Sequence, residues 1–114
     1  MFTAKQNPNG SGRLDIMEKS GKNLEFLNSL EALIRERKAH PAEGSYTNSL
    51  FEKGLPEIIR KVGEEAVEVM VSTLESRKRT VSESADLVYH LLVLLVEQDL
   101  SLAEVVEELE SRHR

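Results

Sequence analysis

Carboxylates at helical spacing in two separate segments are the strongest chemical signal in this sequence. Glu64, Glu65 and Glu68 fall within RKVGEEAVEVM at residues 60–70, and Glu83 and Asp86 fall within SESADLVYHLLVLL at residues 82–95. Carboxylate oxygens are hard ligands of the kind that Mg²⁺ prefers in proteins. If the two segments form neighbouring helices that face each other, their acids can meet in a common Mg²⁺ site.

The helical phase of Glu65 sets it apart from an ordinary surface glutamate. At about 100° per residue, Glu65 lies close in angle to Ile58 and Val62, and therefore borders the apolar face of its helix. A bare carboxylate is costly to bury, so Glu65 needs a cation, a hydrogen-bond network or a route to water. In the second segment Glu83, Asp86, His90 and Glu97 share one stripe of the helix surface.

Two interpretations of these acids stay open at this point. Glutamates on a long helix usually form a solvated face, and Lys61 with Glu65 has the spacing of an ordinary i,i+4 ion pair. The alternative is a metal site. In either case His90 is more typical of a buried, hydrogen-bonded residue that orients a carboxylate than of a ligand to a hard cation.

The basic residues also allow two interpretations. Arg77, Lys78 and Arg79 could contact phosphate, but a charged loop between helices is the more common explanation of such a cluster. Lys53 and Lys61 are closer to the acids in sequence and helical phase. We therefore expect Lys53 and Lys61, rather than the cluster at 77–79, to be phosphate partners.

The elements that carry these residues are all predicted to be helices. Apolar residues recur at three- and four-residue steps in each, and capping residues delimit them. A helix is expected from Asn23 to about His40, a short one after Ser45 that ends at Gly54, and a long one from Pro56 to about Ser76. A fourth is expected after Thr80 or Ser82, and a last one after Ser101. Residues 1–22 are poor in large apolar groups and predict a flexible tail, so that residues 23–114 would form one all-α domain.

Composition restricts the function. A net charge of -5 and a pI near 5.3 disfavour binding to nucleic acid or to an anionic membrane surface. The chain has no cysteine, which excludes disulfides and thiolate metal sites. The N-terminus lacks the apolar core of a signal peptide and no apolar run is long enough to span a membrane, so a cytoplasmic protein is expected.

Several motifs together resemble one enzyme family. They are Ser45-Tyr46-Thr47, Lys53-Gly54, the run from Lys61 to Glu65 with Glu68, and Asp86 with Tyr89-His90. Over about residues 24–110 the chain resembles the phosphoribosyl-ATP pyrophosphatase family, within the all-α, MazG-like nucleotide pyrophosphohydrolases. The wider group shares a pattern of E-E-x-x-E followed by E-x-x-D. This sequence carries both halves, as Glu64, Glu65 and Glu68 and as Glu83 and Asp86. The resemblance implies a four- to five-helix bundle with a disordered or weakly ordered N-terminal tail.

The resemblance also implies an activity and its residues. The activity is Mg²⁺-dependent hydrolysis of phosphoribosyl-ATP to phosphoribosyl-AMP and pyrophosphate, the second step of histidine biosynthesis. It implies that Glu65, Glu68, Glu83 and Asp86 hold Mg²⁺, with Glu64 as a second ligand or as the base for the attacking water. The expected substrate-binding residues are Tyr46, Thr47, Lys53, Lys61 and His90.

Three further expectations concern partners and rivals. The helix from Pro56 is apolar over more than half its circumference, which predicts at least a homodimer. The first 20 or so residues have no counterpart in the family, and the cyclohydrolase domain fused to some members is absent, so a stand-alone enzyme is expected. The rival functions are a MazG-type pyrophosphohydrolase of a free nucleoside triphosphate and a non-catalytic helical adaptor.

Overall fold

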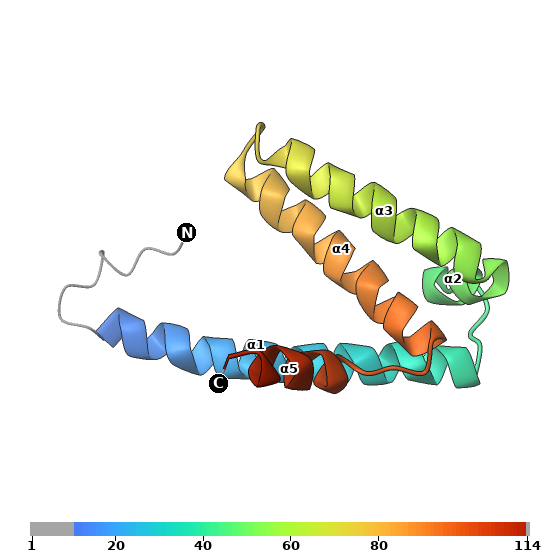
Figure 1. The fold of residues 1–114 in the computed structure, drawn as a ribbon, viewed down its shortest axis with the longest axis horizontal. Coiled ribbons are helices and arrows are strands. Elements are labelled where there is room, and N and C mark those ends of the chain that lie inside the picture. Colours follow the sequence, from blue (N-terminus) through green and yellow to red (C-terminus); the bar gives the residue numbers. More distant parts are fainter. Residues whose placement is uncertain (1–10, 114) are drawn as a thin grey trace. The chain divides into compact units, whose positions relative to one another are not determined.

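A computed structural model describes the backbone of residues 11–113, with the side chains of residue 21 and of residues 24–113. Within that range the regular elements are five helices and no strand (Figure 1). They are α1 (Ser11–Ala39), α2 (Tyr46–Lys53), α3 (Leu55–Ser72), α4 (Arg77–Glu97) and α5 (Leu102–Ser111). The predicted all-α fold with four to five helices is therefore confirmed.

The chain divides into two units between residues 30 and 31, and α1 runs through this boundary. The first unit bears on the predicted tail. Residues 1–10 lie outside the described part of the chain, but from Ser11 onward the backbone is helical. The expected start of this helix at Asn23 is therefore wrong. Residues 11–22 include several good helix formers, and their intrinsic propensity favours helix even without a regular apolar stripe.

The core of the second unit lies chiefly between α3 and α4, which run side by side in opposite directions (Figure 1). Ile58 of α3 and Val93 and Val96 of α4 are fully buried. Each buried aliphatic side chain of this size contributes about 1.5–3 kcal/mol relative to an exposed one. This packing fixes the facing surfaces of the two helices that carry the acidic residues.

Capping residues determine where the helices of the second unit begin and end. Ser45 caps α2 and Ser101 caps α5 with a reciprocal bond to Glu104, both as predicted. Gly54 ends α2 with a φ of 86°, a left-handed conformation that favours glycine. Pro56 follows in the first turn of α3, where its missing N–H leaves no hydrogen bond unmade.

The junction between α3 and α4 differs from the prediction. Helix α3 ends at Ser72 rather than near Ser76, and Ser76 is the N-cap of α4, accepting a hydrogen bond from the backbone N–H of Arg79. The predicted caps Thr80 and Ser82 are therefore wrong. All three residues are competent caps, and the earliest of them adds a further turn of helix. The basic cluster at 77–79 consequently belongs to the first turn of α4.

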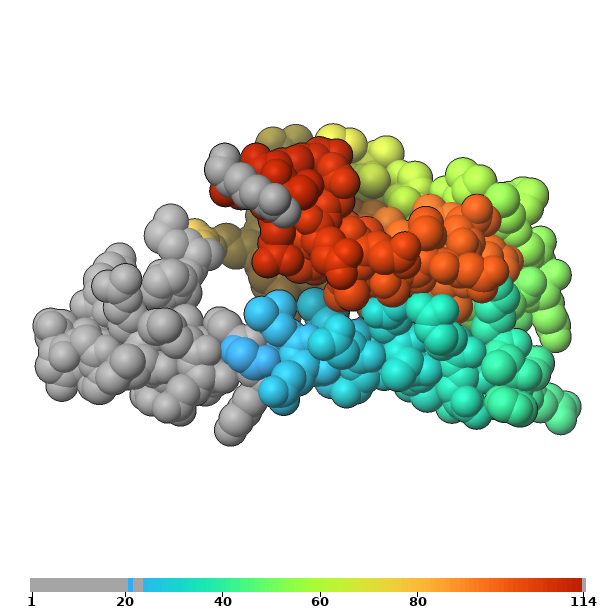
Figure 2. All heavy atoms as spheres, turned by 60° about the horizontal axis from the view of Figure 1, so that its bottom comes forward, coloured from blue at the N-terminus to red at the C-terminus, as the bar shows by residue number. Residues whose placement is uncertain are grey.

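The end of α1 that belongs to the second unit, residues 31–39, is tied to the junction of α4 and α5. Lys38 donates hydrogen bonds to the carbonyl oxygens of Val96 and Glu97, each at 3.3 Å. Glu31 accepts from the backbone N–H of Leu102. Figure 2 shows the corresponding orange and teal atoms in contact. A cation at the C-terminal carbonyls of a helix also offsets the negative end of its dipole.

None of the described helices combines the length and the apolar character that a membrane crossing requires.

Candidate active site

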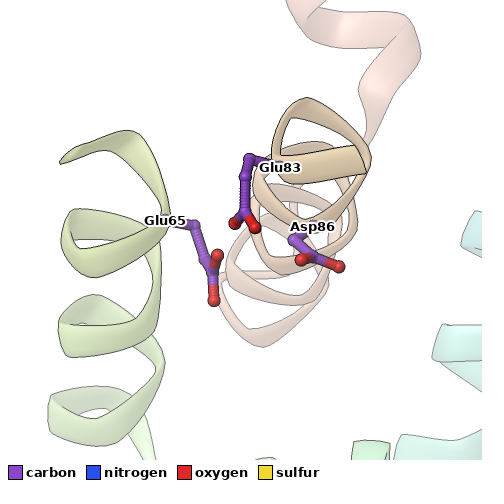
Figure 3. A group of neighbouring side chains, drawn as sticks. All are labelled: Glu65, Glu83 and Asp86. Carbon is purple, nitrogen blue, oxygen red and sulfur yellow. The ribbon is translucent and has the colours of Figure 1, made fainter. Parts of the chain in front are cut away.

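Three of the predicted metal ligands meet between α3 and α4. Glu65 points from α3 towards Glu83 and Asp86 on α4 (Figure 3). One carboxylate oxygen of each lies within 4.8 Å of the others. We call these three residues the acidic triad. Acids from two helices therefore share one small region, as their spacing predicted.

Burial within the acidic triad is graded. Glu65 is buried, with 7% of its surface exposed, Glu83 is partly buried and Asp86 is exposed. Three carboxylates this close repel one another, and the repulsion is strongest where water is excluded. Hard oxygen donors that converge from two helices, buried at one end and open at the other, fit a divalent cation such as Mg²⁺.

One basic residue partly neutralises each of two triad members. Lys61 Nζ lies 3.4 Å from Glu65 Oε1, and Arg79 Nη2 lies 3.3 Å from Glu83 Oε1. Both pairs are separated by one helical turn, the i,i+4 spacing at which side chains of opposite charge meet. Two positive charges do not balance three carboxylates together with the glutamates nearby. The triad therefore remains a favourable place for an added cation.

Glu68, the fourth predicted ligand, lies outside this close group. Its side chain is 47% exposed, and its nearest ion-pair partner among the described residues is Arg79, with Nη2 4.0 Å from Oε2. Glu68 is nevertheless one helical turn from Glu65 on α3, so a small side-chain rotation changes its distance from the triad. Its role as a metal ligand stays a prediction.

Glu64 lies on the solvent side of α3 and has two basic partners. Arg60 donates to it at 2.8 Å and Lys61 at 2.9 Å. The hydrogen bond from Lys61, followed by its charge, lowers the pKa of Glu64 below the usual range of a glutamate. The same hydrogen bond raises the pKa of Lys61. Glu64 is therefore held as a carboxylate, and Lys61 is held as a cation beside the triad.

A chain of hydrogen bonds links the triad to α2. His90 is buried, its Nδ1 lies 2.7 Å from the backbone carbonyl oxygen of Asp86, and its Nε2 lies 2.9 Å from the hydroxyl of Tyr46. A carbonyl oxygen only accepts, so Nδ1 carries the proton, and in the neutral ring Nε2 accepts from Tyr46. Partial burial is the main cause of a raised pKa at Tyr46.

Two further predicted substrate-binding residues, Thr47 and Lys53, also lie on α2. The hydroxyl of Thr47 is hydrogen-bonded to that of Tyr89 on α4, so Tyr46 and Thr47 both join α2 to α4. Lys53 is the exposed last residue of α2. Whether Tyr46, Thr47, Lys53, Lys61 and His90 contact substrate stays a prediction.

Arg79 is the residue that sequence reasoning undervalued. The sequence pattern predicts a charged loop at residues 77–79, whereas Arg79 lies on α4 with its guanidinium beside the triad. Its position four residues before Glu83 was the available signal, since the same spacing drew attention to Lys61 and Glu65. The predicted start of this helix, after Thr80 or Ser82, excludes Arg79 from α4, so the sequence pattern does not reveal this spacing.

Residues 27–113 match the family described as phosphoribosyl-ATP pyrophosphohydrolase. The chain belongs to this family. The matched range includes the acidic triad, Glu64, Glu68 and the whole of α2. It therefore covers every residue that the motifs singled out.

Individual proteins similar to this chain support its membership of the phosphoribosyl-ATP pyrophosphohydrolase family. Phosphoribosyl-ATP pyrophosphatase of Listeria welshimeri is 55% identical over 87 residues, which are 76% of this chain and 84% of that protein. The histidine biosynthesis bifunctional protein HisIE of Caldanaerobacter subterraneus is 48% identical over 98 residues, 85% of this chain and 48% of that protein. The chain therefore spans about half the length of this bifunctional relative. HisIE of Pyrococcus furiosus is 52% identical over 91 residues, 80% of this chain and 43% of that protein.

Proposed function

We propose that this chain is a Mg²⁺-dependent phosphoribosyl-ATP pyrophosphatase that serves the second step of histidine biosynthesis. Family membership and about 50% identity to proteins of that name support the reaction, a hydrolysis of a phosphoanhydride. The observation that carries the proposal within the structure is the acidic triad, since Glu65, Glu83 and Asp86 converge inside the matched range.

The residues suit this chemistry better than covalent catalysis. Hydrolysis of a phosphoanhydride needs neutralised phosphate charge and a positioned water more than it needs a protein nucleophile. Water adds to the α-phosphorus, the bond from that phosphorus to the oxygen bridging to the β-phosphorus breaks, and pyrophosphate leaves. The chain has no cysteine to act as a nucleophile.

The acidic residues would have different roles, since some would hold the metal and others lie at the edge of the metal site. Glu65, Glu83 and Asp86 would hold Mg²⁺, with Glu68 as a further ligand after a side-chain rotation. A bound Mg²⁺ supplies positive charge to the phosphates and lowers the pKa of water. Glu64, at the edge of the triad, accepts hydrogen bonds from Arg60 and Lys61. Glu64 would serve as a further ligand or as the base for the attacking water.

Residues of α2 and α4 would hold the rest of the substrate. Tyr46 is hydrogen-bonded to His90, and His90 is hydrogen-bonded to the backbone of Asp86. A substrate group bound by Tyr46 or His90 would therefore be held at a fixed position relative to the triad. Lys61, kept protonated by its raised pKa, is one source of charge for a phosphate. Lys53, exposed at the end of α2, is a second.

Apolar side chains on the surface of α3 and α4 support a homodimer. Val67, Met70 and Val71 repeat at three- and four-residue steps along α3 and are all exposed. Val81 of α4 is 71% exposed. Surface stripes of this kind mark interfaces in stable oligomers. With no cysteine to require an oxidising compartment, a cytoplasmic homodimer fits the proposed role.

A pyrophosphate-release assay tests the function. Phosphoribosyl-ATP, ATP and dUTP are supplied separately, each with Mg²⁺ and with a chelator. We expect pyrophosphate release from phosphoribosyl-ATP only with Mg²⁺, with the highest kcat/KM of the three. Preference for ATP or dUTP would indicate a MazG-type pyrophosphohydrolase. If none of the three nucleotides is hydrolysed, the result would favour a non-catalytic helical adaptor.

A further inference from the structure

The guanidinium of Arg79 lies among three carboxylates without bonding closely to any of them. Its shortest nitrogen-to-oxygen distances are 3.3 Å to Glu83, 3.6 Å to Glu75 and 4.0 Å to Glu68. Among the described residues, the side chain of Arg79 donates no hydrogen bond. Arg60 provides the contrast, because its guanidinium donates bonds of 2.8–2.9 Å to Glu57 and Glu64.

An ion pair of this kind is easily exchanged for another. The side chain of Arg79 is 48% exposed, and exposed ion pairs contribute little to stability because solvent screens them. A guanidinium carries five N–H donors in a planar fork. Arg79 can therefore turn towards a better acceptor at little cost, and its donors are not committed elsewhere in the described protein.

The location of Arg79 makes a phosphate the expected acceptor. It contacts Glu83, a member of the acidic triad, and reaches Glu68 on the neighbouring helix. If Mg²⁺ and a polyphosphate bind at the triad, Arg79 would be the cation of α4 beside them, since its guanidinium is 3.3 Å from Glu83. Lys61, the other cation at the triad, is already hydrogen-bonded to Glu64 at 2.9 Å, so Arg79 is the less committed of the two.

We propose that Arg79 is a phosphate-binding residue of this site. In the absence of ligand its guanidinium pairs with Glu83 and Glu68. When ligands bind, a divalent cation takes the place of Arg79 beside these carboxylates, and phosphate oxygens become the partners of Arg79. The identity of the phosphate donor rests on the proposed function. The planar fork of arginine matches two phosphate oxygens at once, which an ammonium group cannot do. Arg79 thus has two effects of opposite sign, since it competes with the cation for the carboxylates and attracts the anion.

These opposite effects give a distinctive expectation for Arg79→Gln. Removing one positive charge that lies 3.3–4.0 Å from the carboxylates should tighten Mg²⁺ binding by roughly three- to tenfold in the absence of phosphate. Losing a charge-assisted, two-pronged bond should weaken binding of inorganic pyrophosphate by roughly tenfold or more at saturating Mg²⁺. A residue that only stabilised the helix junction would produce neither change.

The experiment compares Arg79→Gln with Arg77→Gln, which removes the same charge two residues away, where no ion pair is formed with a described residue. Calorimetry measures Mg²⁺ alone and then inorganic pyrophosphate at saturating Mg²⁺, and circular dichroism verifies the fold. Arg79→Lys keeps the charge without the fork, so we expect wild-type Mg²⁺ affinity and weakened pyrophosphate binding. This third variant keeps the test valid if Arg79→Gln does not fold.

Identical binding of both ligands by wild type, Arg79→Gln and Arg77→Gln would overturn the proposal, and so would full pyrophosphate affinity in Arg79→Lys. The outcome is independent of the identity of the substrate. If phosphoribosyl-ATP is not hydrolysed, the two binding measurements still test Arg79. If it is hydrolysed but Arg79→Gln behaves like Arg77→Gln, only the assignment of Arg79 fails.

Discussion

At the scale of single residues, the site depends on carboxylates that are only partly neutralised. Each of the two helices supplies an acid with a basic residue one turn before it, Lys61 for Glu65 and Arg79 for Glu83. Asp86 has no such partner among the described residues. An added divalent cation relieves the remaining repulsion, and binding to the folded state alone stabilises that state.

Asp86→Asn is the sharpest single test of the triad, because the amide has the same shape and no charge. We expect kcat/KM for phosphoribosyl-ATP to fall at least ~100-fold, since charge stabilisation at the reacting phosphate is lost. We also expect Mg²⁺ to raise the melting temperature of the wild type but not of Asp86→Asn. Calorimetric unfolding with and without Mg²⁺ measures this effect independently of activity.

The matched control for this test is Glu110→Gln, which removes a carboxylate from the exposed surface of α5. It should leave both the Mg²⁺ effect and kcat/KM unchanged. An equal loss in Glu110→Gln, or a full Mg²⁺ effect in Asp86→Asn, would show that Asp86 does not hold the metal.

Tyr46 gives a prediction about pH. Its pKa is raised above the ordinary 10.0, chiefly by burial, so the folded state favours the neutral phenol. The stability that this group contributes is therefore fully present below the pKa of an unfolded tyrosine, and it is lost as pH rises through the raised value. The tyrosinate absorbance of wild type minus that of Tyr46→Phe should titrate with a midpoint above 10.0.

The denatured chain provides the reference for this titration, because both of its tyrosines ionise near the ordinary value in denaturant. The stability difference between wild type and Tyr46→Phe should also shrink as pH rises beyond that point. A midpoint at or below that of the denatured chain would mean that burial does not hold the phenol of Tyr46 in its neutral form.

Residue spacing predicted part of this site. The phase of Glu65 on its helix, and the three-residue step from Glu83 to Asp86, were sufficient to place these acids on facing surfaces. Spacing could not separate Glu68 from them, because side-chain rotation within one turn decides which carboxylate reaches the centre. It also could not show that Tyr46 donates to His90, since 44 residues separate them and only the tertiary packing brings them together.

At the scale of elements, the buried side chain of Asn48 helps to fix the position of α2. Asn48 donates to the carbonyl oxygen of Arg37 at 2.6 Å and accepts from the backbone N–H of Ala42 at 2.7 Å. It thereby ties α2 to the end of α1 and to the loop between them. The same helix carries Tyr46 and Thr47, so Asn48 positions the residues that join α2 to the site.

Asn48→Ala should destabilise the protein by about 1–3 kcal/mol, because two partly buried backbone groups lose their partner. We also expect a higher KM, since Tyr46 loses its fixed position, while Mg²⁺ binding at the triad is retained. Chemical denaturation and the pyrophosphate-release assay measure these effects. Ser49→Ala, on the same helix, removes an exposed hydroxyl and should change stability by less than ~0.5 kcal/mol. Equal effects of the two substitutions would contradict the role of Asn48.

The helices themselves were largely predictable, and their ends were less so. Ser45, Gly54 and Ser101 were found because each stands alone at a change of pattern. Ser76 was missed because Thr80 and Ser82 are equally competent caps, and local sequence does not decide among them. The start of α1 was missed because propensity can sustain a helix where the apolar pattern is absent.

At the scale of the whole molecule, the second unit leaves apolar surface that its own core does not use. The stripe of Val67, Met70 and Val71 continues to Leu74, which is 88% exposed. Each of these side chains would contribute about 1.5–3 kcal/mol on full burial. A second copy of the chain offers the same stripe, and a two-fold arrangement lets each copy cover the other.

Met70→Glu tests this homodimer because it places a charge in the middle of the stripe. A dimer with two-fold symmetry would bring the two new glutamates into one apolar interface, so desolvation and repulsion act together. We expect sedimentation velocity to show a dimer for the wild type and a monomer for Met70→Glu at micromolar concentration. Met70→Leu keeps an apolar side chain of similar size and should remain dimeric. A wild-type monomer, or a Met70→Glu dimer as tight as the wild type, would rule out this stripe as the interface. Because α3 carries both the stripe and Glu65, loss of the dimer should also lower kcat/KM if the facing copy stabilises that helix.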